Sequence, residues 1–252
     1  MIETVSIVVG DRFAEFARNS EVSGVSEFIG ALRNGAAVVH PIVIGQGLAP
    51  EALDELNALL PPGPGQPAAD LDIPTRATSA LTHKRAAKNI MVSVPVARSG
   101  QLFEAELFLD DRNEVMEDHQ TGQHIQGLAL IEAARQLWTA VTERYLSPPD
   151  KPSRFVIDSV QTTFSRFVFP LPATMTLEVL DSASGPVQST YAVRILILQN
   201  GQTSTTIDAR YRVIDARVSE RQEAQAARHA IRVAVPATVR PVAAASVAAA
   251  VA

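Results

Sequence analysis

The sequence contains no cysteine. That absence excludes disulfide bonds, thiolate metal ligands and a cysteine nucleophile, and it is compatible with a reducing compartment. No apolar run reaches the roughly 18 residues that a membrane-spanning helix needs. The first residues, MIET, lack the basic start of a signal peptide, and Asp11 and Arg12 interrupt the apolar run that follows. We therefore expect a cytoplasmic protein without a membrane partner.

Long clusters of lysine and arginine are also lacking. The net charge of the 252 residues is −5 and the pI is about 5.6, so we expect no nucleic-acid partner. Hydrophobic residues make up 46% and charged residues 19% of the chain. This balance is typical of a soluble globular protein with one large domain, or one medium domain with appendages.

The stretch around which the chain is organised is a polar loop followed by a long helix. The loop, residues 118–127 (DHQTGQHIQG), carries two histidines, and the helix is expected to continue to about Leu146, before the Ser147-Pro148-Pro149 breaker. Apolar residues lie around most of the helix, which predicts a buried helix. Charged and polar residues inside it indicate a site, because charges are rarely buried unless they are paired or used. These residues are Gln126, Glu132, Arg135 and Gln136.

The first 60 residues read as a small α/β segment. Strands are expected at residues 5–9 and 38–44, and helices at 13–18, 25–33 and 50–60. Gly45-Gln46-Gly47 between strand and helix lacks the third glycine of a dinucleotide-binding fingerprint, so we interpret it as a simple turn. Residues 61–80 are rich in proline and glycine and predict a linker.

The remaining chain alternates like an antiparallel sheet. Strands are expected at residues 89–96, 102–109, 154–160, 161–169, 174–180, 189–199 and 202–213, with Asn200-Gly201 as a hairpin turn. Several antiparallel strands and one central helix predict an α+β hotdog fold over residues 81–218. Residues 219–252 begin as a charged helical piece to Arg228 and become an Ala/Val-rich tail, which we expect to be disordered.

Three segments resemble the A-factor biosynthesis (AfsA-type) hotdog family. They are residues 118–136, with the two histidines and LIEAARQ; residues 83–92, with HKR and NIMV; and residues 164–167, FSRF. The resemblance implies action on a β-ketoacyl thioester, carried on the phosphopantetheine of acyl carrier protein or coenzyme A, with no other cofactor. Family members join the acyl group to dihydroxyacetone phosphate, on the way to γ-butyrolactone or furan signalling molecules. They usually carry two hotdog repeats, so a single repeat implies a homodimer with its site at the interface.

Catalytic roles follow from a wider similarity to hotdog hydroxyacyl-carrier-protein dehydratases, whose Gly-x-x-x-x-Glu-Ala-x-x-Gln pattern matches Gly127, Glu132 and Gln136. Glu132 is expected either to act as a general acid or base with a pKa raised by burial, or to form a buried salt bridge with Arg135 or with a residue from another element. His119 is expected to act as a base near the thioester carbonyl, oriented by Asp118 or by a main-chain carbonyl, or to be an exposed loop residue. His124 is a third catalytic candidate, or else it caps the helix or faces an interface.

Further residues are candidates for substrate binding. Gly127 would let an acyl or pantetheine group approach helix N–H donors, or it would allow close packing. Arg135, Arg85 and Arg166 are candidates for gripping phosphate, with surface salt bridges as the alternative. The other candidates are the amides of Gln123, Gln126 and Gln136. No metal site is expected, because the sequence has no cysteine and no histidine pair four residues apart.

The large apolar side chains near these candidates are expected to be core rather than acyl-tunnel lining; they are Trp138, Phe164, Phe167 and Phe169. The preferred reaction is transfer of a β-ketoacyl group to a small phosphorylated hydroxyketone. Two alternatives remain open. One is another hotdog reaction, thioester hydrolysis or hydroxyacyl dehydration. The other is a non-catalytic module that binds an acyl ligand or a partner.

Overall fold

The computed structural model describes residues 5–38, 40–60, 71, 73–117, 122–146 and 152–238, with side chains to residue 234. The described elements are, in chain order, β1 (Ser6–Val9), η1 (Asp11–Phe13), η2 (Phe16–Arg18), β2 (Val22–Gly24), α1 (Val25–Arg33), β3 (Ile42–Ile44), α2 (Pro50–Leu59), α3 (Ser79–Thr82), η3 (Ala87–Asn89), β4 (Val96–Ser99), β5 (Leu102–Glu106), η4 (Glu114–Met116), α4 (Gly127–Val141), η5 (Thr142–Leu146), β6 (Ser153–Phe164), β7 (Thr174–Ser184), β8 (Gln188–Gln199), β9 (Gln202–Asp215) and α5 (Ala216–Thr238). The η elements are 3-10 helices, except η5, which is a π-helix.

A six-stranded antiparallel sheet forms the main layer of the described chain, in the order β4-β5-β7-β8-β9-β6. Its long strands are rich in β-branched residues, and side chains along β8 and β9 alternate between buried and more exposed positions, as a pleated strand with one covered face requires. The predicted hairpin at Asn200-Gly201 is confirmed. Both residues have positive φ, 52° and 70°, which a tight turn between twisted strands needs.

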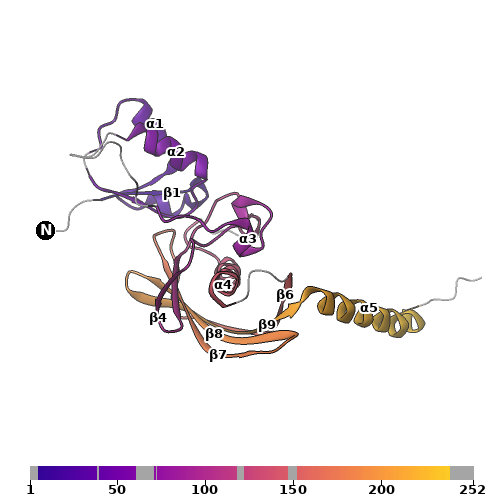
Figure 1. Cartoon of the computed structure of the whole chain (residues 1–252). Coiled ribbons are helices and arrows are strands. Elements are labelled where there is room, and N and C mark those ends of the chain that lie inside the picture. The colour runs from indigo at the N-terminus through magenta and orange to yellow at the C-terminus, as the bar shows by residue number, and fades with distance from the viewer. Residues whose placement is uncertain are drawn as a thin grey trace, which may run out of the picture.

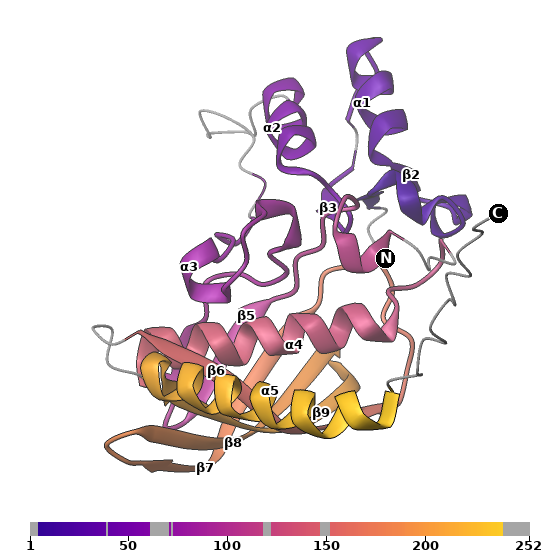
Figure 2. The same ribbon diagram turned by 90° about the vertical axis from the view of Figure 1, so that its right-hand side faces the viewer.

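The sheet curves around α4, which lies in its concave face (Figures 1 and 2). Ten of the fifteen residues of α4 are buried, as expected for a helix that is apolar on most sides. Trp138 of α4 stacks on Tyr211 of β9 with ring centroids 5.6 Å apart. Thr142 and Tyr211 join their hydroxyls by a 2.7 Å hydrogen bond beneath the helix. The predicted α+β hotdog fold is confirmed.

The N-terminal α/β segment contains a parallel sheet of described strands in the order β2-β1-β3, with α1 and α2 above it (Figure 1). The turn after β3 docks this segment on the chain that follows β5 of the hotdog sheet. Gln46 donates from its amide to the Leu107 carbonyl at 2.9 Å and accepts from the Leu109 N–H at 2.9 Å. A Cβ on Gly10 would lie 2.0 Å from the Gly47 carbonyl oxygen, so only glycine permits this approach.

Several predicted elements differ in the structure. The strand expected at residues 89–96 is wrong over most of its length, because Val92 and Ser93 form only isolated bridges and regular pairing begins at Val96, after Pro95. The two strands expected at residues 154–160 and 161–169 are one strand, β6, which ends at Phe164. The helix expected to end at Arg228 extends as α5 from Ala216 to Thr238. The tail from residue 239 lies outside the described residues.

The predicted core assignment holds for only one of four aromatic residues. Trp138 is buried, whereas Phe164, Phe167 and Phe169 are exposed by 52%, 66% and 37%. These three lie on or after the end of β6, where the chain leaves the sheet beside the start of α4. Their exposure leaves an aromatic surface at that end of the central helix.

Candidate functional site

The start of α4 lies against the turn that follows β6. Gln126 is the N-cap residue, and its side-chain amide donates to the Val115 carbonyl at 2.8 Å. The Ile125 N–H donates to the Val168 carbonyl at 2.8 Å. A Cβ on Gly127 would lie 2.7 Å from the Phe164 ring, so the absent side chain makes room for this phenylalanine. Close packing, one of the two explanations for Gly127, is therefore present.

Glu132, one turn further along α4, is the centre of a charged cluster. Its carboxylate accepts two hydrogen bonds from Arg135, at 2.8 and 2.9 Å. The Lys84 ammonium lies 2.6 Å from Glu132 Oε1. The side chains of Glu132, Lys84 and Arg135 are exposed by only 18%, 23% and 25%. One carboxylate thus lies between two cations in a largely covered position.

The ionisation of Glu132 follows from this surrounding. Burial alone raises the pKa of the Glu132 carboxyl, but the hydrogen bonds from Arg135 and Lys84 outweigh it, and the net pKa is lowered from 4.5. The prediction of a raised pKa is therefore wrong, and the alternative prediction of a salt bridge with Arg135 is confirmed. At neutral pH this group is an anion that accepts protons and hydrogen bonds.

Gln136 links the cluster to the chain before β4. Its amide nitrogen donates to the Asn89 carbonyl at 2.8 Å and to Glu132 at 3.0 Å, and its oxygen accepts from the Met91 N–H at 2.8 Å. The side chain is fully buried. Because its amide is used by protein groups on both sides, Gln136 holds residues 89–91 and Glu132 in place.

His124 lies just before the N-terminal end of α4, beside the aromatic surface formed by Phe164, Phe167 and Phe169. Its ring centroid is 4.7 Å from that of Phe167, which lies 6.4 Å from Phe169. Phe169 in turn stacks on Phe16 of the N-terminal segment at 5.7 Å. This series of rings connects the N-terminal segment to the loop before the central helix.

The same loop is held by backbone contacts from the N-terminal segment. The Phe16 N–H donates to the Gly122 carbonyl at 2.9 Å, and the Gln123 amide donates to the Glu15 carbonyl at 3.2 Å. Gln123, a substrate-binding candidate, therefore has a structural contact. His119 and its neighbour Asp118 lie outside the described residues.

The three arginine candidates have different surroundings. Arg135 belongs to the cluster. Arg166 is exposed beside Phe167 and donates to the Thr203 carbonyl at 3.2 Å. Arg85 is exposed on the segment after α3. Lys84, the residue before it, reaches Glu132 instead. The HKR motif contains this lysine, but no local pattern in the sequence shows which of its three residues faces the helix.

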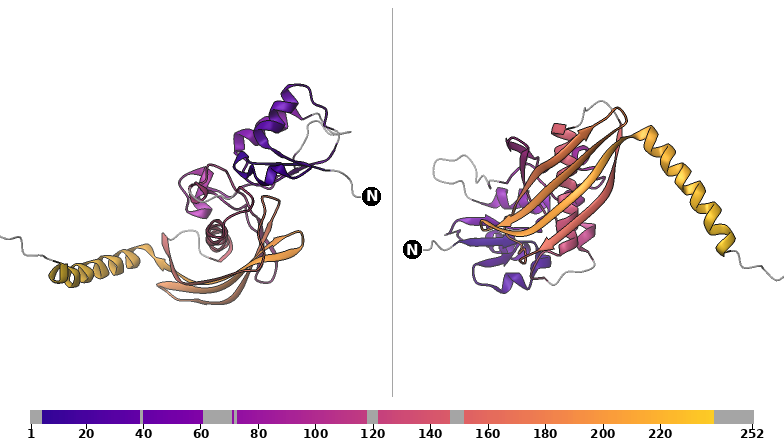
Figure 3. Two further views of the ribbon diagram at one scale, coloured as in Figure 1. Left: turned by 180° about the vertical axis from the view of Figure 1, so that it is seen from behind. Right: turned by 90° about the horizontal axis from the view of Figure 1, so that it is seen from below.

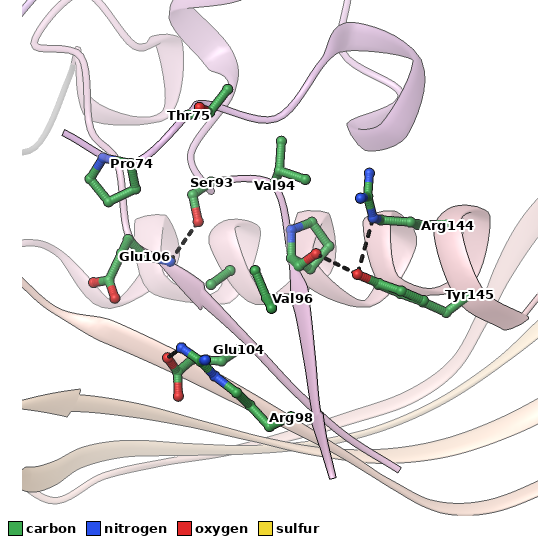
Figure 4. A pocket seen from close by; sticks show the side chains of 12 residues that line it. Pro74, Thr75, Ser93, Val94, Val96, Arg98, Glu104, Glu106, Arg144 and Tyr145 are labelled. Atoms are coloured by element: carbon green, nitrogen blue, oxygen red, sulfur yellow. Dashed lines mark hydrogen bonds and ion pairs between the residues drawn. The ribbon is translucent and has the colours of Figure 1, made fainter. Parts of the chain in front are cut away.

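A cavity of about 420 Å³ lies apart from this cluster, beside β4, β5 and η5 (Figure 4). Arg98 and Glu104 form an ion pair at its wall, and Tyr145 donates to the Pro95 carbonyl at 2.9 Å. Burial raises the pKa of the Glu106 carboxyl, although Thr174 donates a hydrogen bond to it. Within the described residues, no group of three or more His, Asp or Glu side chains is arranged to hold a metal ion.

Comparison with known families decides the affiliation. Residues 65–215, more than half of the chain, match the model of the A-factor biosynthesis hotdog domain. The chain belongs to this family. A search of curated protein sequences found no significant match. Among the helices of the described residues, none has both the length and the apolar character needed to cross a membrane.

Solved structures with some similarity to this A-factor-type hotdog protein include thioesterases. A variant of a Pseudomonas aeruginosa thioesterase is 14% identical, with a TM-score of 0.38, covering 49% of this chain and 81% of the other. A Haemophilus influenzae thioesterase is 12% identical, with a TM-score of 0.37, covering 54% of this chain and 82% of the other. These likenesses are too distant to carry an argument about activity.

Proposed function

We propose that this chain is an acyl-thioester enzyme that transfers a β-ketoacyl group to a small phosphorylated hydroxyketone. Membership of the A-factor family supports the substrate class, with the acyl group carried on the phosphopantetheine of acyl carrier protein or coenzyme A. The observation that carries the reaction type is the cluster of Lys84, Glu132 and Arg135 on the central helix.

The ionised carboxylate suits a base. Glu132 would remove the proton from the hydroxyl of the acceptor, whose oxygen attacks the thioester carbonyl; the C–S bond then breaks and the thiol leaves with a proton. Hydroxyacyl dehydration needs a proton donor for the leaving hydroxyl, which a carboxyl with a lowered pKa supplies poorly. The cluster therefore favours transfer over dehydration.

The charge balance suits a phosphorylated acceptor. Lys84 and Arg135 carry two positive charges against the single negative charge of Glu132, so an anionic group near them gains favourable electrostatics. The Ala129 and Leu130 N–H groups already donate to the Gln126 carbonyl. The Gly127 and Leu128 N–H groups, which precede them at the start of α4, would polarise the thioester oxygen, with His124 beside them. Phe164 covers Gly127 and has to turn aside for such an approach.

A homodimer would complete the site. β6 is an edge strand of the sheet, and an edge of twelve residues is a template for pairing with another chain. Large apolar side chains are exposed along this strand and around the start of α4: Leu128, Ile157, Val160, Phe164 and Phe167. Pairing of two β6 edges would cover them and bring a second chain beside the aromatic surface.

The test measures free thiol and acyl products by mass spectrometry, from β-ketoacyl thioesters of coenzyme A and of acyl carrier protein. We expect thiol release that depends on dihydroxyacetone phosphate, with the acyl ester as product. Thiol release without the phosphate would assign hydrolysis, water loss from a 3-hydroxyacyl thioester would assign dehydration, and ligand binding without turnover would assign a binding module. Each of these three results would overturn the proposed transfer.

Variants connect the reaction to the cluster. Glu132→Gln should lower kcat by about 100-fold or more, the range of a lost general base. Lys84→Met should raise KM for the phosphorylated acceptor and leave KM for the thioester unchanged. Lys88→Met is the matched control, because Lys88 pairs with Glu114 and Glu117, outside the cluster. Equal effects of Lys84→Met and Lys88→Met would remove the acceptor-binding role.

A further inference from the structure

The C-terminal helix α5 is the largest described element that packs on little of its own chain. It leaves the sheet after β9 and projects beyond the edge formed by β6 (Figures 1 and 3). Asp215 caps its start by accepting from the Arg217 and Val218 N–H groups, and Arg154 of β6 pairs with Glu220. From residue 220 to 234 every side chain is exposed. A helix with so little tertiary packing gains little stability from its own domain.

One face of α5 carries a row of arginines. Arg217, Arg221, Arg228 and Arg232 are spaced by four, seven and four residues, which places them on one side of a helix over about 22 Å. Among the described side chains none forms an ion pair with these four arginines, whereas the two glutamates of α5 pair with Arg154. Ala224, Ala227 and Ile231 form an apolar row beside the arginines, with Ile231 exposed by 61%.

The rest of the chain has the opposite charge. Four of the 22 Lys and Arg residues and two of the 27 Asp and Glu residues lie in α5, so this helix has a net charge of +2 and the remaining chain −7. A second copy therefore attracts the arginine row electrostatically. A copy paired at the free edge of β6 also lies on the side to which α5 projects (Figure 3).

We propose that α5 is an arm that packs its arginine and apolar rows on a second copy of this chain, across the β6 edge. This rests on the homodimer suggested above and extends it, because the arm adds a contact that the sheet edge alone does not provide. We choose a second copy as the partner of α5 because three observations favour it: the direction in which α5 projects, the opposite charge of the rest of the chain, and the exposed apolar side chains on α5.

Crosslinking tests the arm directly, because the chain has no cysteine of its own. Ala227→Cys places a unique thiol on the apolar row for a maleimide photo-crosslinker, and Gln222→Cys places one on the other side of α5 as control. Equal amounts of isotopically light and heavy full-length protein are mixed, so that light–heavy peptides report contacts between copies. We expect such peptides from Ala227→Cys at about tenfold the yield from Gln222→Cys. Equal yields of light–heavy peptides from the two variants, or crosslinks only within a single chain, would overturn the proposal that α5 packs on a second copy.

Sedimentation of matched variants measures its contribution. Arg228→Gln with Arg232→Gln lowers the net charge by two, as does Gln222→Glu with Ala226→Glu on another face. The first pair should raise the dimer dissociation constant about tenfold or more and the second should not. An unchanged dimer constant, with lost binding to phosphatidylglycerol vesicles, would assign the row to lipid headgroups and overturn the proposal. If the protein is a monomer and still turns over thioesters, both the homodimer and the role of α5 are wrong, while the proposed reaction stands.

Discussion

The contact between Lys84 and Glu132 yields the most exacting prediction. Lys84→Met, Glu132→Gln and the double variant form a double-mutant cycle. The two groups are 2.6 Å apart, and both are less than a quarter exposed, which places the pair between surface salt bridges of about 0–1 kcal/mol and buried pairs whose disruption costs about 3–5 kcal/mol. Glu132→Gln alone also leaves Lys84 and Arg135 facing each other without a carboxylate between them.

We expect each single variant to lower the free energy of unfolding by about 2 kcal/mol, and a coupling energy of about 1.5 kcal/mol, so that the double variant is less destabilised than the sum. A loss of this size lowers the melting temperature by about 4–8 °C in a chain of this length. Urea unfolding monitored by the single Trp138, buried against Tyr211, measures all four proteins.

The coupling should depend on pH in one direction. The pKa of Glu132 is lower in the folded than in the unfolded chain, so its stabilising contribution is fully present above the ordinary value of 4.5 and is lost as the pH falls through the folded pKa. The cycle is therefore repeated in buffers above and below 4.5. A coupling below about 0.3 kcal/mol at neutral pH, or one that stays constant on acidification, would refute the arrangement of this cluster.

Three further variants test other parts of the structure by the same unfolding assay. Gln136→Leu should cost about 2–4 kcal/mol, because it leaves the buried Met91 N–H and the half-buried Asn89 carbonyl without their partner, and a cost under about 1 kcal/mol would contradict those bonds. Gly127→Ala should be neutral or destabilising beside the Phe164 ring but stabilising by about 0.5–1 kcal/mol in a Phe164→Ala background; equal effects in both backgrounds would disprove the contact. Gln46→Leu should cost about 2–3 kcal/mol and loosen the docking of the N-terminal segment, seen as faster amide exchange there; unchanged exchange would argue against Gln46 as the link.

Much of the fold followed from local patterns. The hairpin at Asn200-Gly201 and the bounds of α1 depend on turn chemistry and helical periodicity, which act over a few residues. The strand expected at residues 89–96 failed for the complementary reason. Its alternation suits a strand, but strand formation needs a neighbour with free backbone groups, and the chain pairs regularly only from Val96.

The candidate site was predictable as a region and not as a set of contacts. The polar residues of the central helix identified Glu132 and Arg135, three residues apart on one face. Lys84 precedes Glu132 by 48 positions in the sequence. It reaches the Glu132 carboxylate because α3, which ends shortly before Lys84, packs against α4. From the sequence alone, burial in the helix suggested a raised pKa for Glu132. In the structure, Lys84 and Arg135 lower this pKa by more than burial raises it.

By itself, the sequence determined where α1 and the Asn200-Gly201 turn lie, that the central helix is buried, and that the chain offers no cysteine chemistry, because these depend on residue types and short spacings. Only the tertiary structure decided that Glu132 is ionised between two cations, that Phe164 covers the start of α4, and that α5 projects past the sheet edge. The physical reason is the same in each case: ionisation, packing and exposure depend on neighbours in space, and those neighbours come from distant parts of the chain.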